Sequence, residues 1–348
     1  MKFYTFAFVI ITSFLQLTAS DTLHESSISQ NTGKAFINEL DFSGKCLHQR
    51  DWEQALINKD ILEKLVLREI SFCYSFFVDG EERFYPSAKY FGEQFPEVLE
   101  INFPMLTEFY FDWPCYLGWA YDDSPLIFIS HQTTLETLSL NGWIFGREEN
   151  RFMHEYLIVR DFRLLSSLTN LKFLSLTDTL FLPDNIEQMQ YTLLPNLEII
   201  NADGSTIKGA HWDVFVPNLK VLSLAKSSIN GTDMLHIAKL SQLKKLNLSL
   251  SKISGGNIKL LAKLNHLFEL NLKGTDMTKA DFSGLQTLKT LDLSNCKFSI
   301  ASFMSLFELH NLKKLKLKNH LSEYENPNIS QEMIQDLIGH LPDCDIEF

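Results

Sequence analysis

One pattern of apolar residues recurs between Leu194 and Lys318 and constrains the fold of this 348-residue chain more than any other feature. Four copies read L-x-x-L-x-L followed five positions later by a further apolar residue, and the copy at 194–209 is a looser version. Five registered copies are very improbable by chance, so the chain is a repeat protein built by adding similar units. The copies occupy residues 194–209, 217–231, 241–255, 265–279 and 286–300.

Each unit contains two kinds of periodicity. The x-L-x-L part alternates with period two and predicts a short strand that buries one face and exposes the other. The stretches that follow, such as 233–240, 256–264 and 302–309, repeat apolar residues at intervals of three and four, which predicts a short helix. Because one such unit cannot bury its apolar side alone, we expect the units to stack into a parallel ladder of strands with one continuous core.

At these residues the chain resembles the leucine-rich-repeat superfamily, whose signature and repeat length it meets. The resemblance implies an α/β solenoid, a horseshoe with a parallel β-sheet on its concave face and short helices on its convex face. It identifies a fold and not an activity. One departure leaves the subtype unassigned. The position three residues after the third leucine is often Asn in this superfamily. In this chain it is occupied by Thr179, Ser205, Ser227, Ser251, Thr275 and Cys296. We expect the small hydroxyl groups at this position to bond to neighbouring backbone.

The order of the segments predicts one repeat domain behind a leader. Residues 1–20 resemble a secretory signal peptide, and the alternative is a buried strand or helix that caps the solenoid. Residues 21–36 are the N-terminal lead-in, and residues 37–348 are expected to form a single leucine-rich-repeat domain of about twelve units. The units near 73–102 and 146–163 are over-long, and such insertions are either functional or tolerated surface loops.

Charge and cysteine content bear on partners and compartment. The net charge of −12 repels phosphate backbones and anionic lipid headgroups, which makes nucleic acid and membrane surfaces poor candidate partners. No second hydrophobic span follows the leader, so we expect a secreted protein without a membrane span once the leader is removed. The five cysteines form no clustered cap, which weakens that expectation and keeps a cytoplasmic location open. Sequons at Asn230, Asn247 and Asn328 are consistent with export in a eukaryote.

The alternation of each strand allows the outward-facing residues to be assigned. Phe173, Ile199 and Val221 fall in the same column of three adjacent strands, which predicts an apolar stripe beside hydroxyl and amide groups. The alternative is that the insertion at 146–162 folds over this stripe and covers it. The residues that we expect to contact a protein partner are Tyr110, Phe173, Ser175, Ile199, Asn201, Val221 and Ser223.

The last two strands carry complementary charges. If Leu341, Cys344 and Ile346 take the three leucine positions of the last unit, three lysines of the previous strand face three acids in register. The predicted pairs each contribute modestly and favour a capping role over an anion site. They are Lys314 with Asp343, Lys316 with Asp345, and Lys318 with Glu347.

The sequence lacks the motifs of common catalytic and cofactor sites. It contains no H-E-x-x-H zinc motif, no G-x-S-x-G nucleophile elbow and no phosphate-binding loop. We therefore expect no catalytic residue, metal or cofactor, and interpret the chain as a non-enzymatic, secreted protein that recognises a protein partner on its concave face. The alternative is an intracellular substrate-recognition subunit of a ubiquitin ligase, although no F-box-like segment precedes Ile37.

Overall fold

The computed structural model describes the chain in segments, and all of them lie within the unit Ile37–Phe348. The predicted signal peptide and lead-in, most of the second insertion and Asn328 fall outside these segments. The described residues are 37–44, 46–47, 55–68, 71–78, 81–86, 101–112, 120–121, 124–145, 157–159, 161–181, 192–207, 211–318 and 329–348.

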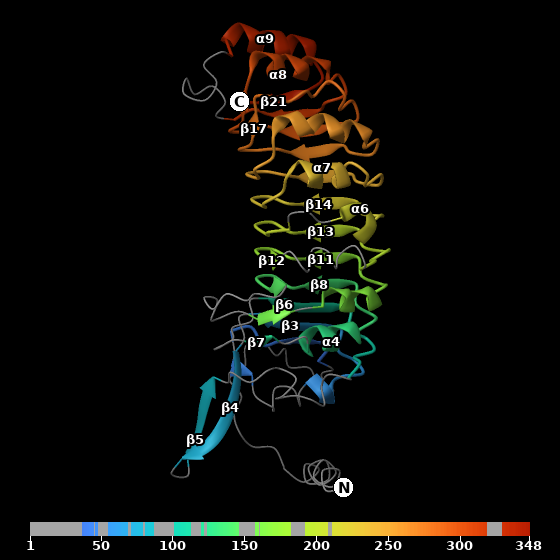
Figure 1. The fold of residues 1–348 in the computed structure, drawn as a ribbon, viewed down its shortest axis with the longest axis vertical. Helices are drawn as coiled ribbons and strands as arrows, with labels where there is room; N and C mark the ends of the chain where they lie inside the picture. Colours follow the sequence, from blue (N-terminus) through green and yellow to red (C-terminus); the bar gives the residue numbers. More distant parts are fainter. Residues whose placement is uncertain are drawn as a thin grey trace, which may run out of the picture. The chain divides into compact units, whose positions relative to one another are not determined.

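A parallel sheet of twelve strands, one from each predicted unit, is the main element (Figure 1). Neighbours in this sheet are also neighbours in the series of units, so every strand between the end strands pairs with the strand of the unit before it and with that of the unit after it. The strands are β1 (Glu39–Asp41), β3 (Lys64–Arg68), β6 (Glu108–Asp112), β8 (Thr137–Ser139), β11 (Phe173–Ser175), β13 (Ile199–Asn201), β14 (Val221–Ser223), β15 (Lys245–Asn247), β16 (Glu269–Asn271), β18 (Thr290–Asp292), β20 (Lys314–Lys316) and β21 (Asp345–Glu347). Side chains that alternate with the buried leucines point outward on one face of this sheet, and we call that face the open face.

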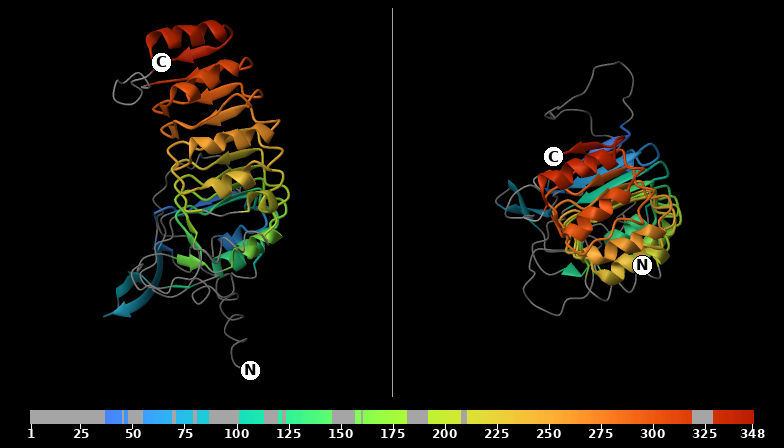
Figure 2. Two further views of the ribbon diagram at one scale, coloured as in Figure 1. Left: turned by 45° about the horizontal axis from the view of Figure 1, so that its top comes forward. Right: turned by 90° about the horizontal axis from the view of Figure 1, so that it is seen from above.

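Short helices lie on the other side of the core from the open face (Figure 2). Successive helices stack on one another along the units, as α6 does on α7 and α7 on η4. The three stretches predicted to be helical all contain helix, part of it as tighter 3₁₀ turns. The helices are α4 (Ser124–Ser130), η3 (Phe162–Ser167), α6 (Trp212–Phe215), α7 (Gly231–Ile237), η4 (Gly255–Lys263), α8 (Ile300–Met304), η5 (Ser305–Glu308) and α9 (Gln331–His340).

Smaller sheets flank the main one. In one of them β10 lies beside β7 and β9, and in another a long hairpin of β4 and β5 follows the short strand β2. Most of the hairpin falls within the predicted first insertion near 73–102. The strands are β2 (Cys46–Leu47), β4 (Ser71–Val78), β5 (Glu81–Pro86), β7 (Ala120–Tyr121), β9 (Ile144–Phe145), β10 (Leu157–Val159), β12 (Leu180–Phe181), β17 (Asp276–Met277) and β19 (Lys297–Phe298).

The repeated leucines form the centre of the core, which also contains buried phenylalanine, tryptophan, isoleucine and methionine side chains. Leu219, Leu222 and Leu224 of one unit are fully buried, and the equivalent residues of the neighbouring units pack against them. Each buried leucine contributes roughly 1.5–3 kcal/mol relative to an exposed one. The stacked units therefore share one continuous core, as the repeat predicts.

After eight strands of the main sheet, the described chain turns through a residue with left-handed backbone geometry. Gly204, two positions after the third apolar position of its unit, has a φ of 72°, and a Cβ there would lie 2.0 Å from Oδ1 of Asp178. Glycine removes both the strain and the clash at this position. Residues other than glycine adopt the same conformation in other units, namely Asp178, Lys226, Leu250 and Asn295.

Hydroxyl groups form the ladder that asparagine often forms in leucine-rich repeats. Ser227 is buried, and its Oγ donates to the carbonyl of Ala202 at 2.7 Å. Cys296 donates through Sγ to the carbonyl of Leu272 at 3.0 Å, and burial raises the pKa of this thiol. The expectation that small side chains at this position bond to neighbouring backbone is therefore confirmed.

The last unit is offset from the predicted register. Leu341 is the C-cap of α9, and Leu309 is the C-cap of η5 in the previous unit. The amide of Cys344 donates to the carbonyl of Leu341 at 3.0 Å. Ile346 then pairs with Leu315, the second leucine of the previous unit. Cys344 and Ile346 therefore take the first and second leucine positions, with one residue fewer between them than in the other units.

This offset makes two of the three predicted lysine and acid pairs wrong, Lys314 with Asp343 and Lys316 with Asp345, whereas the predicted pair of Lys318 with Glu347 forms. Lys314 lies opposite Asp345, and Lys316 lies opposite Glu347. The ion pairs that form are Lys314 with Glu347, Lys314 with Asp345 at 4.0 Å, Lys318 with Glu347 at 3.1 Å, Lys316 with Asp292 at 3.9 Å and Lys313 with Asp343 at 3.5 Å.

Candidate functional site

Three apolar side chains lie side by side on the open face, where the alternation predicted them. Phe173 on β11 is in register with Ile199 on β13, which is in register with Val221 on β14. Ile199 is 37% exposed, and the other two are half-buried. We call Phe173, Ile199 and Val221 the apolar stripe. An apolar group that stays exposed in the middle of a polar sheet face is a feature of contact surfaces.

Exposed ion pairs border one edge of the apolar stripe. They come from the residues that directly precede the strands. Lys172 pairs with Glu136 at 2.7 Å, and Lys220 pairs with Glu198 at 2.5 Å. The bond from Lys220, together with the charges of Lys172 and Lys244, lowers the pKa of Glu198. The stripe therefore has a charged edge that sequence reasoning did not single out.

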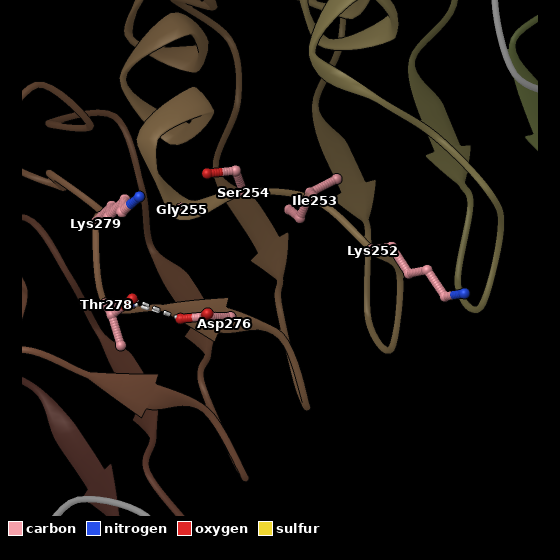
Figure 3. A pocket seen from close by; sticks show the side chains of 7 residues that line it. All are labelled: Lys252, Ile253, Ser254, Gly255, Asp276, Thr278 and Lys279. Atoms are coloured by element: carbon pink, nitrogen blue, oxygen red, sulfur yellow. Dashed lines mark hydrogen bonds between the residues drawn. The ribbon is translucent and has the colours of Figure 1, made fainter.

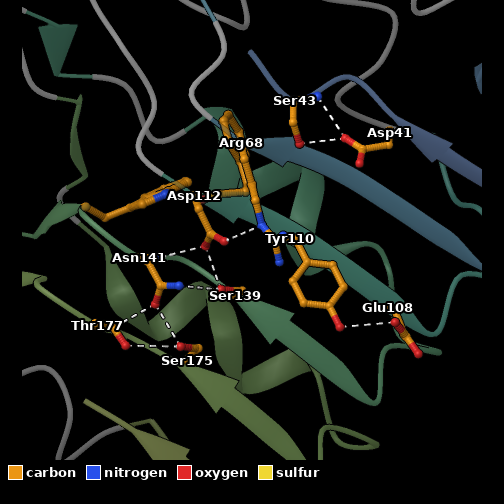
Figure 4. Close-up of polar contacts among 12 residues, drawn as sticks. Asp41, Ser43, Arg68, Glu108, Tyr110, Asp112, Ser139, Asn141, Ser175 and Thr177 are labelled. Carbon is orange, nitrogen blue, oxygen red and sulfur yellow. Dashed lines mark hydrogen bonds and ion pairs between the residues drawn. The ribbon is translucent and has the colours of Figure 1, made fainter. Parts of the chain in front are cut away.

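Hydroxyl and amide groups border the other edge and form a hydrogen-bonded network across the strands (Figure 4). Asp112 accepts from Nε of Arg68 at 3.0 Å and from Oγ of Ser139 at 2.5 Å. Asn141 continues the network, because its Oδ1 accepts from Oγ of Ser175 and from the amide of Thr177, each at 2.7 Å. This network joins β3, β6, β8 and β11.

The predicted polar contact residues take part in such internal bonds. Ser175 is only 6% exposed and donates to Asn141. Ser223 donates to Oδ1 of Asp203 at 2.5 Å and accepts from Nδ2 of Asn247 at 2.9 Å. Oδ1 of Asn201 accepts from the amide of Asp203 at 3.2 Å. These side chains hold the turns that follow the strands, which is the usual role of Asn, Asp and Ser there.

Tyr110 lies apart from the apolar stripe. It is on β6, and β8 separates that strand from β11. The Arg68 guanidinium lies 4.8 Å from the Tyr110 ring centroid, and the Tyr110 hydroxyl donates to Oε2 of Glu108 at 3.1 Å. Burial, followed by the Glu108 bond and charge, raises the pKa of Tyr110. Tyr110 and Phe173 therefore belong to two separate parts of the open face.

Two of the three sequons fall on described residues. Asn230 is the N-cap of α7, and its side chain accepts from the amides of Thr232 and Asp233. Asn247 lies on the open face, where its Nδ2 donates to Ser223.

A shallow pocket of about 260 Å³ lies away from the open face, where the strand of one unit turns into η4 (Figure 3). Asp276 in this pocket accepts from the amide and the hydroxyl of Thr278, at 3.0 and 2.8 Å, which lowers the pKa of its carboxyl. Lys279 also lines the pocket, and the side chain of Lys252 points away from Asp276. Because a carboxylate and an ammonium group share the pocket, it favours neither an anion nor a cation.

The described part of the chain contains no group of three His, Cys, Asp or Glu side chains arranged to hold a metal ion. Within the same residues, no helix is long and apolar enough to cross a membrane.

The comparisons with known proteins rest on structure alone, because no protein-family model and no curated protein sequence matches the chain. One similar structure is an internalin from Listeria monocytogenes, with a TM-score of 0.48, 16% identity, and coverage of 89% of this chain and 86% of that one. A leucine-rich-repeat protein from Leptospira interrogans gives a TM-score of 0.42 and 19% identity over 89% and 90% of the two chains. TLR13, solved as a complex with ssRNA13, gives a TM-score of 0.52 and 19% identity over 79% of this chain and 39% of its own. At these identities the similarity extends to the fold only.

Proposed function

We propose that this protein, a leucine-rich-repeat solenoid by its sheet and by its similarity to solved structures, is a secreted, non-enzymatic protein that binds a protein partner on its open face. The observation that carries the proposal is the apolar stripe, in particular Ile199, which is 37% exposed in the interior of the twelve-stranded sheet. When a partner covers such a residue, burial of its apolar surface stabilises the complex. The proposed domain organisation is a cleaved leader, residues 1–20, and a binding domain, residues 37–348.

Two observations support a protein partner over nucleic acid. The solved TLR13 complex contains ssRNA13, whereas this chain carries a net charge of −12, which repels a phosphate backbone. The stripe is apolar and bordered by both signs of charge, which fits a mixed protein surface.

Site-specific cross-linking tests the proposed surface. A photo-reactive amino acid at Thr137, which is in register with Phe173, should give a discrete cross-linked product in the native type of cell. The same residue at Leu235, which is 50% exposed on α7, is the control and should give no such product.

The double variant Phe173→Asp and Ile199→Asp should weaken partner binding at least about thirtyfold, because two central apolar contacts are worth about 2 kcal/mol or more. Because both positions face outward, the variant should still fold and unfold cooperatively, at a somewhat lower temperature since Phe173 is half-buried and the two carboxylates lie in register. Unchanged cross-linking from Thr137 in the variant would remove the stripe from consideration.

Terminal sequencing of cell and medium fractions tests export. A chain that starts near Asp21 in the medium is the expected result. An intact Met1 in the cytosol would overturn the secreted part of the proposal and favour the alternative, an intracellular substrate-recognition subunit of a ubiquitin ligase.

A further inference from the structure

We propose that the partner presents an acidic peptide segment, which lies along a row of lysines that continues from the apolar stripe. This inference names the chemistry of the partner and rests on the binding function proposed above. It is carried by the backbone register, by the ion pairs and by the distribution of charge on the open face.

The lysine row consists of Lys220, Lys244, Lys289 and Lys313, with Phe268 in its middle. Each of these residues directly precedes a strand of the main sheet, from β14 to β20. The amide of Lys244 donates to the carbonyl of Lys220, that of Phe268 to Lys244, that of Lys289 to Phe268 and that of Lys313 to Lys289, all at 2.8–3.0 Å. These bonds place the five residues on consecutive strands, about 4.8 Å apart, so the row is about 20 Å long.

The lysine row and the apolar stripe form one continuous surface. Lys220 directly precedes Val221, the last residue of the stripe. Lys245 is in register with Val221, and its ammonium group lies 5.7 Å from the Phe268 ring centroid. A partner that covers the stripe and extends across the next strands therefore meets positive charge.

The positive charge is concentrated on one part of an otherwise acidic chain. On the open face from β15 to β20 and in the residues directly before these strands, lysines outnumber acids, although the whole chain has a net charge of −12. The lysines are Lys244, Lys245, Lys273, Lys289, Lys313, Lys314, Lys316 and Lys318, and the acids are Glu269 and Asp292.

Internal ion pairs neutralise only part of this charge. β21 and the residues before it pair with Lys313, Lys314 and Lys318 at the end of the sheet. Lys245 pairs with Glu269 at 2.7 Å. In contrast, Lys244 and Lys289 are exposed and have no ion pair with any described residue within 4.0 Å. The two unpaired lysines flank Phe268, so the middle of the row is available to an anion.

Carboxylates of a peptide fit this row better than phosphates. Lysine is the only basic residue type in the row, and its ammonium group is a point charge that by itself accepts either kind of anion, so the spacing and the neighbouring apolar surface decide between them. Acidic side chains three and four residues apart on a helix are about 5–6 Å from each other, close to the strand spacing of about 4.8 Å. The adjoining stripe adds apolar contact, which an acidic amphipathic segment can use.

Binding of a defined probe to the full chain tests the inference. The probe is a fluorescent poly-L-glutamate of about 20 residues, and its affinity is measured by anisotropy at 0.1 M and 1 M NaCl. We expect binding at the lower salt concentration and its loss at the higher one, because the screening length falls from about 10 Å to about 3 Å.

Two charge-matched variants assign the site. Lys244→Glu with Lys289→Glu should weaken binding on the order of tenfold, because each reversal removes an attraction and adds a repulsion. Lys252→Glu with Lys279→Glu makes the same change in net charge at exposed lysines around the pocket of Figure 3 and should leave the affinity within about twofold. Equal weakening by both variants would overturn the assignment.

Competing anions decide the class of ligand. Tighter binding of a single-stranded RNA of about 20 nucleotides, or of a heparin fragment, than of poly-glutamate would replace the acidic peptide with another polyanion. This outcome is separable from the test of function. If cross-linking from Thr137 depends on the stripe but not on Lys244 and Lys289, the binding function stands and the present inference fails.

Discussion

At the scale of single residues, Glu347 shows how the end of the sheet is held. Hydrogen bonds from Lys314 and then Lys318 lower the pKa of this carboxyl to about 2 from its usual value of about 4.5. A carboxyl whose pKa is lowered by folding stabilises the fold above its unfolded pKa. That contribution is present above about pH 4.5 and is lost as the pH falls through about 2.

A titration followed by NMR checks this assignment. The Glu347 side-chain carboxyl should titrate near pH 2, and Lys314→Gln should return its pKa toward 4.5 because the first of its two partners is removed. Lys297→Gln, on β19 and outside these ion pairs, is the control and should leave the value unchanged. A midpoint near 4.5 in the original protein would show that the two lysines do not hold this carboxylate.

At the scale of elements, the start of α7 has a complete capping box. Oδ1 of Asn230 accepts from the amide of Asp233 at 3.1 Å, and Oδ2 of Asp233 accepts from the amide of Asn230 at 2.6 Å. The two bonds satisfy amides that a helix otherwise leaves without a partner at its first turn. Asn230, the acceptor residue of a predicted sequon, therefore also stabilises the start of α7.

Substitutions at Asn230 separate the cap from the sequon. In protein made without glycosylation, Asn230→Ala should lower the free energy of unfolding by about 1 kcal/mol, because the side-chain acceptor is lost. Asn230→Asp keeps the acceptor while removing the sequon, so chemical denaturation should give nearly the original stability. If both variants lose the same free energy, the cap is not the cause.

At the scale of the whole molecule, each strand of the main sheet is hydrogen-bonded within that sheet only to the strands of the neighbouring units. A solenoid of this kind has a stability that is approximately a sum of local terms. A cavity in the middle of the sheet should therefore weaken the adjacent units more than distant ones.

The variant Leu246→Ala tests this locality. Leu246 lies on β15 and is 2% exposed, so its truncation should cost about 2–5 kcal/mol. Hydrogen exchange should accelerate most in β14, β15 and β16 and least in β6. Leu235→Ala, at an exposed position of α7, should stay within about 0.5 kcal/mol. A uniform acceleration over all strands would instead indicate one cooperative unit.

The apolar repeat by itself was sufficient to predict the solenoid, the strand of each regular unit and the register of the apolar stripe. Buried leucines alternate with outward residues, and the same alternation recurs in every unit, so Phe173, Ile199 and Val221 could be placed in one column. The shortened last unit could not be placed in this way. The pattern of apolar residues alone allows Ile346 to take either the second or the third leucine position. The pairing of Ile346 with Leu315 in the sheet shows that it takes the second.

Only the tertiary structure decided which outward groups remain available to a partner. Ser175 and Ser223 point outward by alternation, but acceptors from neighbouring units, Asn141 and Asp203, already bind their hydroxyls. Lys244 and Lys289 are 45 positions apart in the sequence. They lie in one row because backbone hydrogen bonds through Phe268, the residue directly before β16, hold both in register. The sequence determines which face of a strand a residue occupies, since that depends on local alternation. Whether its polar group is already bonded depends on residues that only stacking brings within hydrogen-bonding distance.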